Sequence, residues 1–119
     1  MAVTVLIVDD HPSFRASARA LLEAEGFEVV GAAADGESAV ELALVLRPEL
    51  VLLDVMLPDM SGFEVAERLA GAAASRIILV SSREQGDYGQ RVRRSGALGF
   101  VAKDRLSGAA LRELMGAAA

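Results

Sequence analysis

Five short apolar runs, separated by stretches with helical spacing, constrain the fold of this chain more than any other feature. The runs are often β-branched and mostly do not alternate with polar positions. This is typical of strands covered on both faces, as in a parallel sheet. The runs cover residues 3–8, 27–32, 50–53, 77–80 and 98–101. The 119 residues suit one domain and leave no room for two.

Helix signals fill the intervals between these runs. Pro12 suits the first turn of a helix. The N–H of a residue at that position has no acceptor within the helix, so proline loses no hydrogen bond there. Ser61, with Glu64 three residues later, forms a capping box. The fourth helix is polar, contains two glycines and has the weakest signal. The five predicted helices begin at Pro12, at Gly36 behind the cap Asp35, at Ser61, at Gly86 and behind the cap Ser107.

The alternation of strands and helices predicts an α/β fold with right-handed crossovers. For five strands we expect a flavodoxin-like (βα)5 three-layer sandwich, with a five-stranded parallel sheet in the order 2-1-3-4-5. In such sheets, ligands bind at the carboxyl ends of the strands where the strand order reverses. Here that point lies between the first and third strands.

Polar side chains follow four of the five predicted strands. They are Asp9, Asp10, Asp54, Ser81, Ser82 and Lys103. Two carboxylates 4 Å apart repel each other by about 4 kcal/mol at an effective dielectric of 20, so a bound cation is expected to offset the charge. Clustered oxygen ligands suit Mg²⁺. A carboxylate beside such an ion, with an ammonium and a hydroxyl nearby, suits phosphoryl transfer.

These motifs resemble those of response regulator receiver domains in two-component signalling, and the resemblance covers the whole chain. That family has an acidic pair after its first strand, a phosphoacceptor Asp after the third, a Thr or Ser after the fourth and a Lys after the fifth. The opening VDDHPSFR and the segment GFVAKD are most similar to receivers of regulators with a LuxR-type helix-turn-helix.

The resemblance implies a role for each of seven residues. Asp54 would accept a phosphoryl group from a histidine kinase, and the face formed by helix 4, strand 5 and helix 5 would switch. Asp10 and Asp54 would bind Mg²⁺ directly, Asp9 would bind it through water, and Met56 through its backbone carbonyl. Ser81 and Lys103 would contact the phosphoryl oxygens. Phe100 would be the switch aromatic.

Several of these residues have a plainer interpretation. The acidic pair could cap the first helix, and Phe100 could be a core residue in one state and a switch in another. His11 is interpreted as an exposed turn residue rather than a metal ligand. Ser81 replaces the commoner Thr, and Met56 occupies a position that can gate water.

Charge and composition narrow the function classes. The formal charge of −5 argues against direct nucleic-acid contact by this domain, and the absence of cysteine excludes disulfides. The first apolar run is too short for a signal peptide or a membrane span, so we expect a cytoplasmic protein without a membrane partner. We expect residues 1–119 to be one receiver domain without an output domain, either a separated piece or a stand-alone receiver. The sequence leaves open whether the domain forms a homodimer.

Two alternatives from other classes remain. A Mg²⁺-dependent phosphatase of the haloacid dehalogenase type also uses an Asp at a strand end, but it requires Asp-x-Asp after its first strand, whereas Asp9 and Asp10 are adjacent. A pseudo-receiver would act only as a binding module, but here the acidic pair, acceptor and lysine are all present. We expect a signalling domain that catalyses only its own phosphorylation and dephosphorylation.

Overall fold

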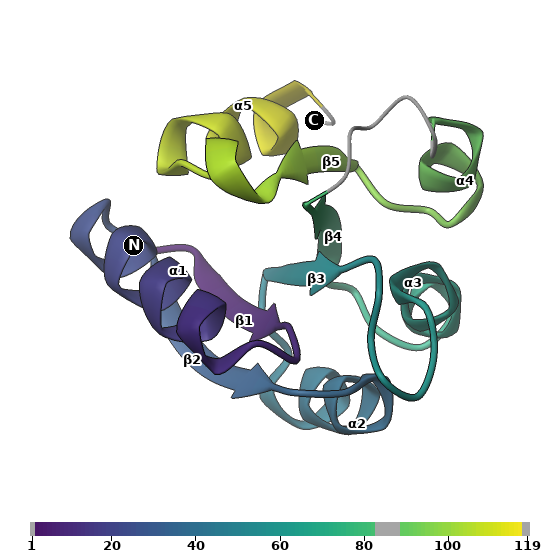
Figure 1. The fold of residues 1–119 in the computed structure, drawn as a ribbon. Helices are drawn as coiled ribbons and strands as arrows, with labels where there is room; N and C mark the ends of the chain where they lie inside the picture. The colour runs from purple at the N-terminus through teal and green to yellow at the C-terminus, as the bar shows by residue number, and fades with distance from the viewer. Residues whose placement is uncertain (1, 83–88, 118–119) are drawn as a thin grey trace.

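One parallel sheet of five strands forms the centre of the molecule in the computed structural model, which describes residues 2–82 and 89–117. Its order is β2-β1-β3-β4-β5, which confirms the predicted flavodoxin-like topology (Figure 1). The strand order reverses between the neighbouring strands β1 and β3. The strands are β1 (Thr4–Val8), β2 (Glu28–Ala33), β3 (Leu50–Asp54), β4 (Arg76–Ser81) and β5 (Gly99–Ala102).

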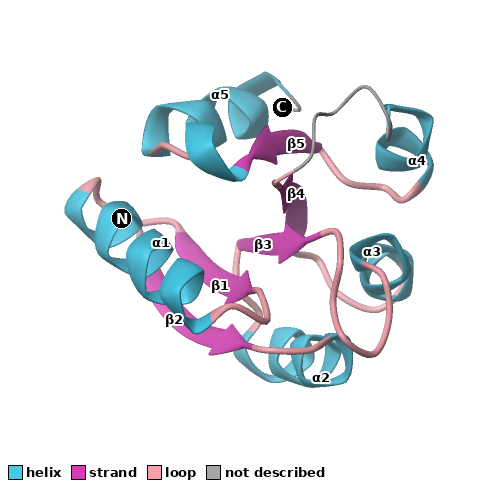
Figure 2. Ribbon diagram, in the orientation of Figure 1, coloured by secondary structure: helices cyan, strands magenta, loops and turns pink. Residues whose placement is uncertain are grey.

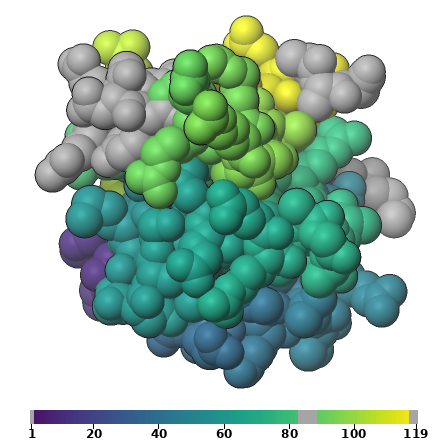
Figure 3. All heavy atoms as spheres, turned by 90° about the vertical axis from the view of Figure 1, so that its right-hand side faces the viewer, coloured from purple at the N-terminus to yellow at the C-terminus, as the bar shows by residue number. Residues whose placement is uncertain are grey.

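Helices cover both faces of the sheet (Figures 1 and 2). They are α1 (Pro12–Ala24), α2 (Gly36–Leu46), α3 (Gly62–Ala70), α4 (Gly89–Arg94) and α5 (Gly108–Ala117). Figure 3 looks onto the face that carries α4 (green), α3 (teal) and α2 (blue), whereas α1 and α5 cover the other face. The predicted start of the fourth helix at Gly86 lies outside the described residues. Within the described part of the chain, none of the helices is long and apolar enough to cross a membrane.

Successive side chains of each strand point to opposite faces of the sheet, and each face is covered by an apolar core. The strands are therefore buried on both faces. Leu6 and Val8 of β1 pack on the side of α2 and α3, whereas Val5 and Ile7 pack on the side of α1 and α5. All five residues of β3 are buried. This burial on both faces explains why the apolar runs of the sequence do not alternate with polar residues.

The predicted side-chain caps are present at three helices. Each cap oxygen accepts a hydrogen bond from a backbone N–H of the first helical turn, where the helix itself offers no acceptor. The pairs are Asp35 with Ser38 at 2.8 Å, Ser61 with Glu64 at 3.1 Å and Ser107 with Ala110 at 3.0 Å.

The buried face of α2 differs from the sequence pattern in one position. The helical spacing of Val40, Ala43 and Leu44 places them on one face, yet Leu44 is 43% exposed while Ala43 is fully buried. The buried stripe follows Ala39 and Ala43, which are four residues apart and therefore lie one above the other. An α-helix has about 3.6 residues per turn, so Leu44 lies about 100° around the helix axis from Ala43.

Gly62 brings the start of α3 directly against the end of β3. Its N–H donates to the carbonyl of Val55 at 2.6 Å. A Cβ at this position would overlap the carbonyl oxygen of Asp54 and lie 3.0 Å from Cα of Val55. Because these neighbours are backbone atoms, they cannot rotate away. The absence of a side chain at Gly62 therefore fixes how closely α3 approaches the strand that ends in Asp54.

We predict that Gly62→Ala lowers the free energy of unfolding by about 1–3 kcal/mol, the usual cost of overpacking. Gly71→Ala is the matched control, because no atom of the described residues lies within 4 Å of a Cβ built there. That variant is expected to be neutral or slightly more stable, since it restricts the unfolded chain. Urea unfolding of the three proteins measures the difference, and equal midpoints would contradict the packing argument.

Candidate functional site

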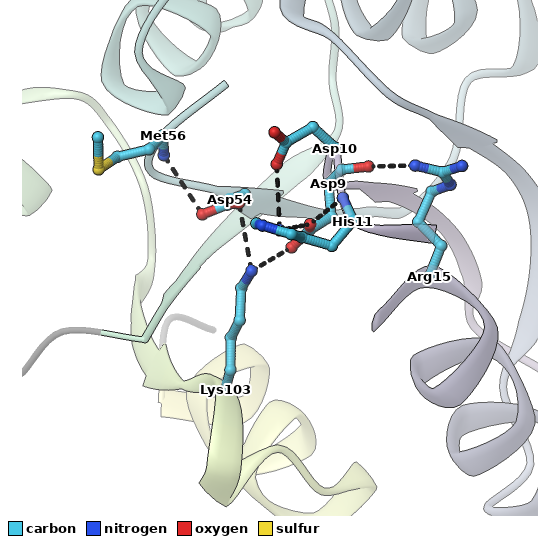
Figure 4. A network of polar contacts seen from close by, with 7 residues as sticks. All are labelled: Asp9, Asp10, His11, Arg15, Asp54, Met56 and Lys103. Atoms are coloured by element: carbon cyan, nitrogen blue, oxygen red, sulfur yellow. Dashed lines mark hydrogen bonds and ion pairs between the residues drawn. The ribbon is translucent and has the colours of Figure 1, made fainter. Parts of the chain in front are cut away.

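Three carboxylates meet at the carboxyl edge of the sheet, where the strand order reverses. Asp9 and Asp10 follow β1, and Asp54 ends β3, which pairs directly with β1. One ligand atom from each of these residues and from His11 lies within 4.8 Å of the others (Figure 4). The predicted convergence of the three acids is therefore confirmed. The resulting cluster is one that could bind a metal ion.

Lys103 reaches this cluster from the end of β5. Its Nζ lies 2.6 Å from Oδ2 of Asp9 and 3.3 Å from Oδ2 of Asp54 (Figure 4). The ammonium is also 4.7 Å from the ring centroid of Phe14 on α1, where the face of the ring attracts a cation. The contacts place one positive charge between two buried carboxylates, so the lysine offsets part of their repulsion.

Burial and neighbouring charges give the two buried carboxyl groups different pKa values. Burial, together with the charge of Asp9, raises the pKa of Asp54 to about 6, although the Met56 N–H and Lys103 act in the opposite direction. Burial also acts to raise the pKa of Asp9, but hydrogen bonds from Lys103 and His11 outweigh it and hold that pKa below its usual range. The shorter Lys103 contact explains why Asp9 is the more strongly stabilised anion.

The ammonium of Lys103 is stabilised in its charged form by the same contacts. Burial acts to lower its pKa, but the hydrogen bond to Asp9 and the charges of Asp54 and Asp9 outweigh burial and raise it. At neutral pH the site therefore holds a charged lysine, an ionised Asp9 and an Asp54 that is ionised but close to its titration range.

Two other predicted residues, Ser81 and Met56, line a solvent-facing hollow of about 280 Å³ beside the carboxylates. Ser81 is buried at the end of β4 and pairs in register with Ala102 of β5. The Met56 side chain is exposed, and its N–H donates to Oδ1 of Asp54 at 3.3 Å. The hollow is lined by Asp10, His11, Asp54, Met56, Leu57, Pro58, Ser81, Ser82 and Lys103.

Phe100 lies apart from this hollow, in the core between the sheet and the helices α2, α3 and α4. It is 9% exposed and belongs to the same apolar cluster as Val92 of α4. The sequence left open a core position and a switch position, and this structure shows the core position. Phe100 pairs in register with Leu79 on β4, two residues before the end of that strand.

His11 is the exposed turn residue that we expected, and its ring also contacts both acids of the pair. Its ring is 64% exposed, as expected, but Nδ1 lies 2.9 Å from Oδ1 of Asp9 and 3.1 Å from Oδ1 of Asp10. His11 is also the N-cap residue of α1. The alternative that the acidic pair caps this helix is therefore not realised at that position. The Asp9 carboxylate instead accepts the peptide N–H of His11 at 2.8 Å.

Two further residues hold the site together and were not identified from the sequence. Arg15 donates from its guanidinium to the carbonyl of Asp9 at 2.8 Å. Asp59 accepts the N–H groups of Gly36 and Glu37 at 2.8 and 3.0 Å, which lowers its pKa and ties the loop after β3 to the start of α2. An acid in a loop facing a helix N-terminus is a recognisable pairing only once the two segments are known to be neighbours.

We predict that Asp54→Asn stabilises the metal-free protein at neutral pH. The pKa of Asp54 rises from 3.8 when unfolded to about 6 when folded, so stability present at low pH is lost as the pH rises through 6. That loss corresponds to at most about 3 kcal/mol, and asparagine avoids it. Urea unfolding in EDTA should show a gain at pH 7.5 that shrinks toward pH 4.

The control for this prediction is Mg²⁺, which should stabilise the parent more than Asp54→Asn because the parent has one more carboxylate in the cluster. Equal stability of the two proteins at pH 7.5, or a larger difference at pH 4, would contradict the proposed origin of the raised pKa.

Comparison with known proteins agrees with this geometry. A family model of the response regulator receiver domain matches residues 5–115. A putative transcriptional regulator of Pseudomonas aeruginosa is 40% identical over 100 residues, which are 83% of this chain and 48% of that protein. The nitrate/nitrite response regulator protein NarL of Escherichia coli is 39% identical over 104 residues, which are 85% of this chain and 48% of that protein. The chain thus spans about half the length of these curated relatives.

Solved structures show the same fold. The signal receiver domain of the putative response regulator NarL from Mycobacterium tuberculosis superposes with a TM-score of 0.85 at 34% identity, covering 97% of this chain and 98% of that one. A LuxR-family two-component response regulator from Aurantimonas sp. gives a TM-score of 0.86 at 29% identity, covering 98% and 87%. Together with the converging strand-end residues, these matches show that the chain belongs to the response regulator receiver domains of two-component systems.

Proposed function

We propose that this receiver domain accepts a phosphoryl group on Asp54 in a Mg²⁺-dependent transfer from a histidine kinase. The observation that carries the proposal is the position of the Asp54 carboxylate. It lines a solvent-facing hollow, 3.3 Å from Lys103 and within 4.8 Å of the acidic pair. A nucleophile, a cationic group and a cluster of metal ligands are thereby brought to one place.

The donor set fits a hard cation such as Mg²⁺. Asp10 and Asp54 would bind it directly, Met56 through its carbonyl and Asp9 through water. When bound, Mg²⁺ supplies positive charge that neutralises the acids and the oxygens of the transferred group. Asp9 is fully buried, and its Oδ2 has Lys103 as an ion-pair partner. This places its carboxylate behind the hollow rather than on its surface.

The chain's own residues would then carry out a direct displacement. A carboxylate oxygen of Asp54 attacks the phosphorus, the bond from phosphorus to the donor imidazole breaks, and an acyl phosphate forms on Asp54. Lys103 is already in contact with Asp54 and would follow the new negative charge. Ser81, at the end of the adjacent strand, would donate its hydroxyl to a phosphoryl oxygen.

The signal would be a population shift of the face formed by α4, β5 and α5. Moving a 1:99 equilibrium to 99:1 takes about 5.5 kcal/mol of differential stabilisation, whereas one charge-assisted hydrogen bond supplies about 1.5–3 kcal/mol. The Lys103 contact, the Ser81 contact and a packing change at Phe100 would therefore have to act together. Phe100 would exchange between the buried position seen here and another one.

The wider assignments of the protein follow from this role. We propose a cytoplasmic signalling domain that catalyses only its own phosphorylation and dephosphorylation. The curated relatives are about twice the matched length, and one solved structure of the same fold is a two-component response regulator of the LuxR family. The partner domain would therefore be a LuxR-type DNA-binding output domain. Residues 1–119 would form the receiver alone, and its formal charge of −5 argues against a direct role in DNA contact. A homodimer remains an assembly compatible with this role.

We predict that incubation with acetyl phosphate and Mg²⁺ adds the mass of one phosphoryl group to the parent protein and none to Asp54→Asn. Intact-mass spectrometry measures the product, and EDTA should prevent its formation because the acidic cluster then lacks its counter-charge. Turnover of many equivalents of acetyl phosphate would instead indicate a phosphatase. An unmodified parent would indicate a pseudo-receiver.

We predict that Met56→Asn loses the phosphoryl group faster than the parent. The Met56 side chain is 60% exposed beside Asp54, where an apolar group hinders the approach of water and an amide would assist it. Met56→Leu keeps an apolar side chain and serves as the matched control. The decay of the phosphorylated mass over time measures the rate, and equal decay of all three proteins would contradict the gating role.

A further inference from the structure

We propose that Phe14 is a positioning residue for phosphoryl transfer, because the face of its ring holds the ammonium of Lys103 in place while that ammonium changes its hydrogen-bond partner. The inference rests on the proposed function, since it assigns the residue that supports Lys103 in that reaction. Phe14 lies in the first turn of α1, and the centroid of its ring is 4.7 Å from Nζ of Lys103. The two residues are distant in the chain and meet only in the folded domain.

The ammonium of Lys103 is shared unequally between two acids. Its Nζ lies 2.6 Å from Oδ2 of Asp9 and 3.3 Å from Oδ2 of Asp54, and Figure 4 shows it between the two carboxylates. Transfer places new negative charge on the phosphoryl oxygens at Asp54, so Lys103 has to follow that charge and loosen its contact with Asp9. A contact that persists during this exchange would keep the ammonium in the site.

The ring of Phe14 offers such a contact. The negative face of an aromatic ring attracts a cation within about 6 Å of its centroid, and the attraction is stronger where water is excluded. Only 17% of the Lys103 side chain is exposed, so water competes little for the ammonium. The attraction acts over the whole face of the ring, whereas a hydrogen bond weakens steeply when its angle changes. The ring can therefore hold the ammonium before and after the exchange.

Packing anchors the ring of Phe14 beside the site. The side chain is half-buried and packs against the apolar cluster on the side of α1 and α5, which includes Ile7 and Val101. Ile7 belongs to β1 and Val101 to β5, the two strands that are followed by Asp9 and Lys103. Side chains in such a close-packed core move little. The ring is therefore fixed on the same core that positions the acid and the ammonium.

A plainer role for Phe14 is apolar packing, and fluorination of the ring separates the two roles. Fluorine withdraws negative charge from the ring face and weakens its attraction for a cation, while the ring keeps nearly the same size. Phe27 provides a matched control. Its ring centroid lies 4.4 Å from the guanidinium carbon of Arg112, beyond the opposite end of α1 and away from the acidic cluster.

Phosphorylation by acetyl phosphate with Mg²⁺, followed by intact mass, measures the effect on the reaction. Trifluorophenylalanine in place of Phe14 should slow it by about two- to fivefold. At about 1.4 kcal/mol per factor of ten, this is about 0.4–1 kcal/mol, the range of a weak cation–π contact. Monofluorophenylalanine should give an intermediate rate, and trifluorophenylalanine in place of Phe27 should leave the rate unchanged. Urea unfolding of each protein shows that the forms compared are equally folded.

NMR tests the contact itself, without phosphorylation. Protons held over the face of an aromatic ring resonate upfield of their usual position. The methylene protons of Lys103 next to Nζ should therefore be shifted upfield in the parent, and they should return to their usual position in Phe14→Leu, which keeps an apolar side chain but has no ring.

Two results would overturn the inference. One is an unchanged position of the Lys103 resonances in Phe14→Leu. The other is a protein with trifluorophenylalanine in place of Phe14 that reacts as fast as the parent, which would show that the ring acts only through its size. A parent protein that gains no phosphoryl group would contradict the proposed function instead, and the NMR comparison would still decide whether Phe14 holds Lys103.

Discussion

The contact between Lys103 and the two buried carboxylates is the interaction on which the site depends. A carboxylate taken out of water without a partner costs several kcal/mol, and both Asp9 and Asp54 are buried. One ammonium at 2.6 and 3.3 Å offsets part of that cost for each of them. The contact exists because β1, β3 and β5 end at the same edge of one parallel sheet. The topology of the fold and the electrostatics of the site are therefore linked.

The unequal sharing of Lys103 gives the two acids different properties. Asp9 has the closer ammonium and the additional donors of His11, so its pKa is lowered, while burial beside an anion raises the pKa of Asp54 to about 6. One acid is thus a firmly held anion and the other a less stabilised one. Functional residues are often held at such a cost to stability.

Much of the fold could be predicted from the sequence because its signals are local. The apolar runs mark the strands, and the caps Asp35, Ser61 and Ser107 begin helices where predicted. Other features could not be predicted. The exposure of Leu44 depends on how α2 is rotated against the sheet. The roles of Arg15 and Asp59 depend on neighbours that are distant in the chain or defined only by the turn after β1.

The sequence by itself determined which residue types stand at the strand ends, because a buried strand followed by a polar residue is a pattern of adjacent positions. Only the tertiary structure decided how closely the charged groups of those residues approach one another. Whether Lys103 lies closer to Asp9 or to Asp54 depends on a difference of less than 1 Å in packing. Coulomb energies in a partly buried site change appreciably over such distances, and no spacing along the chain encodes them.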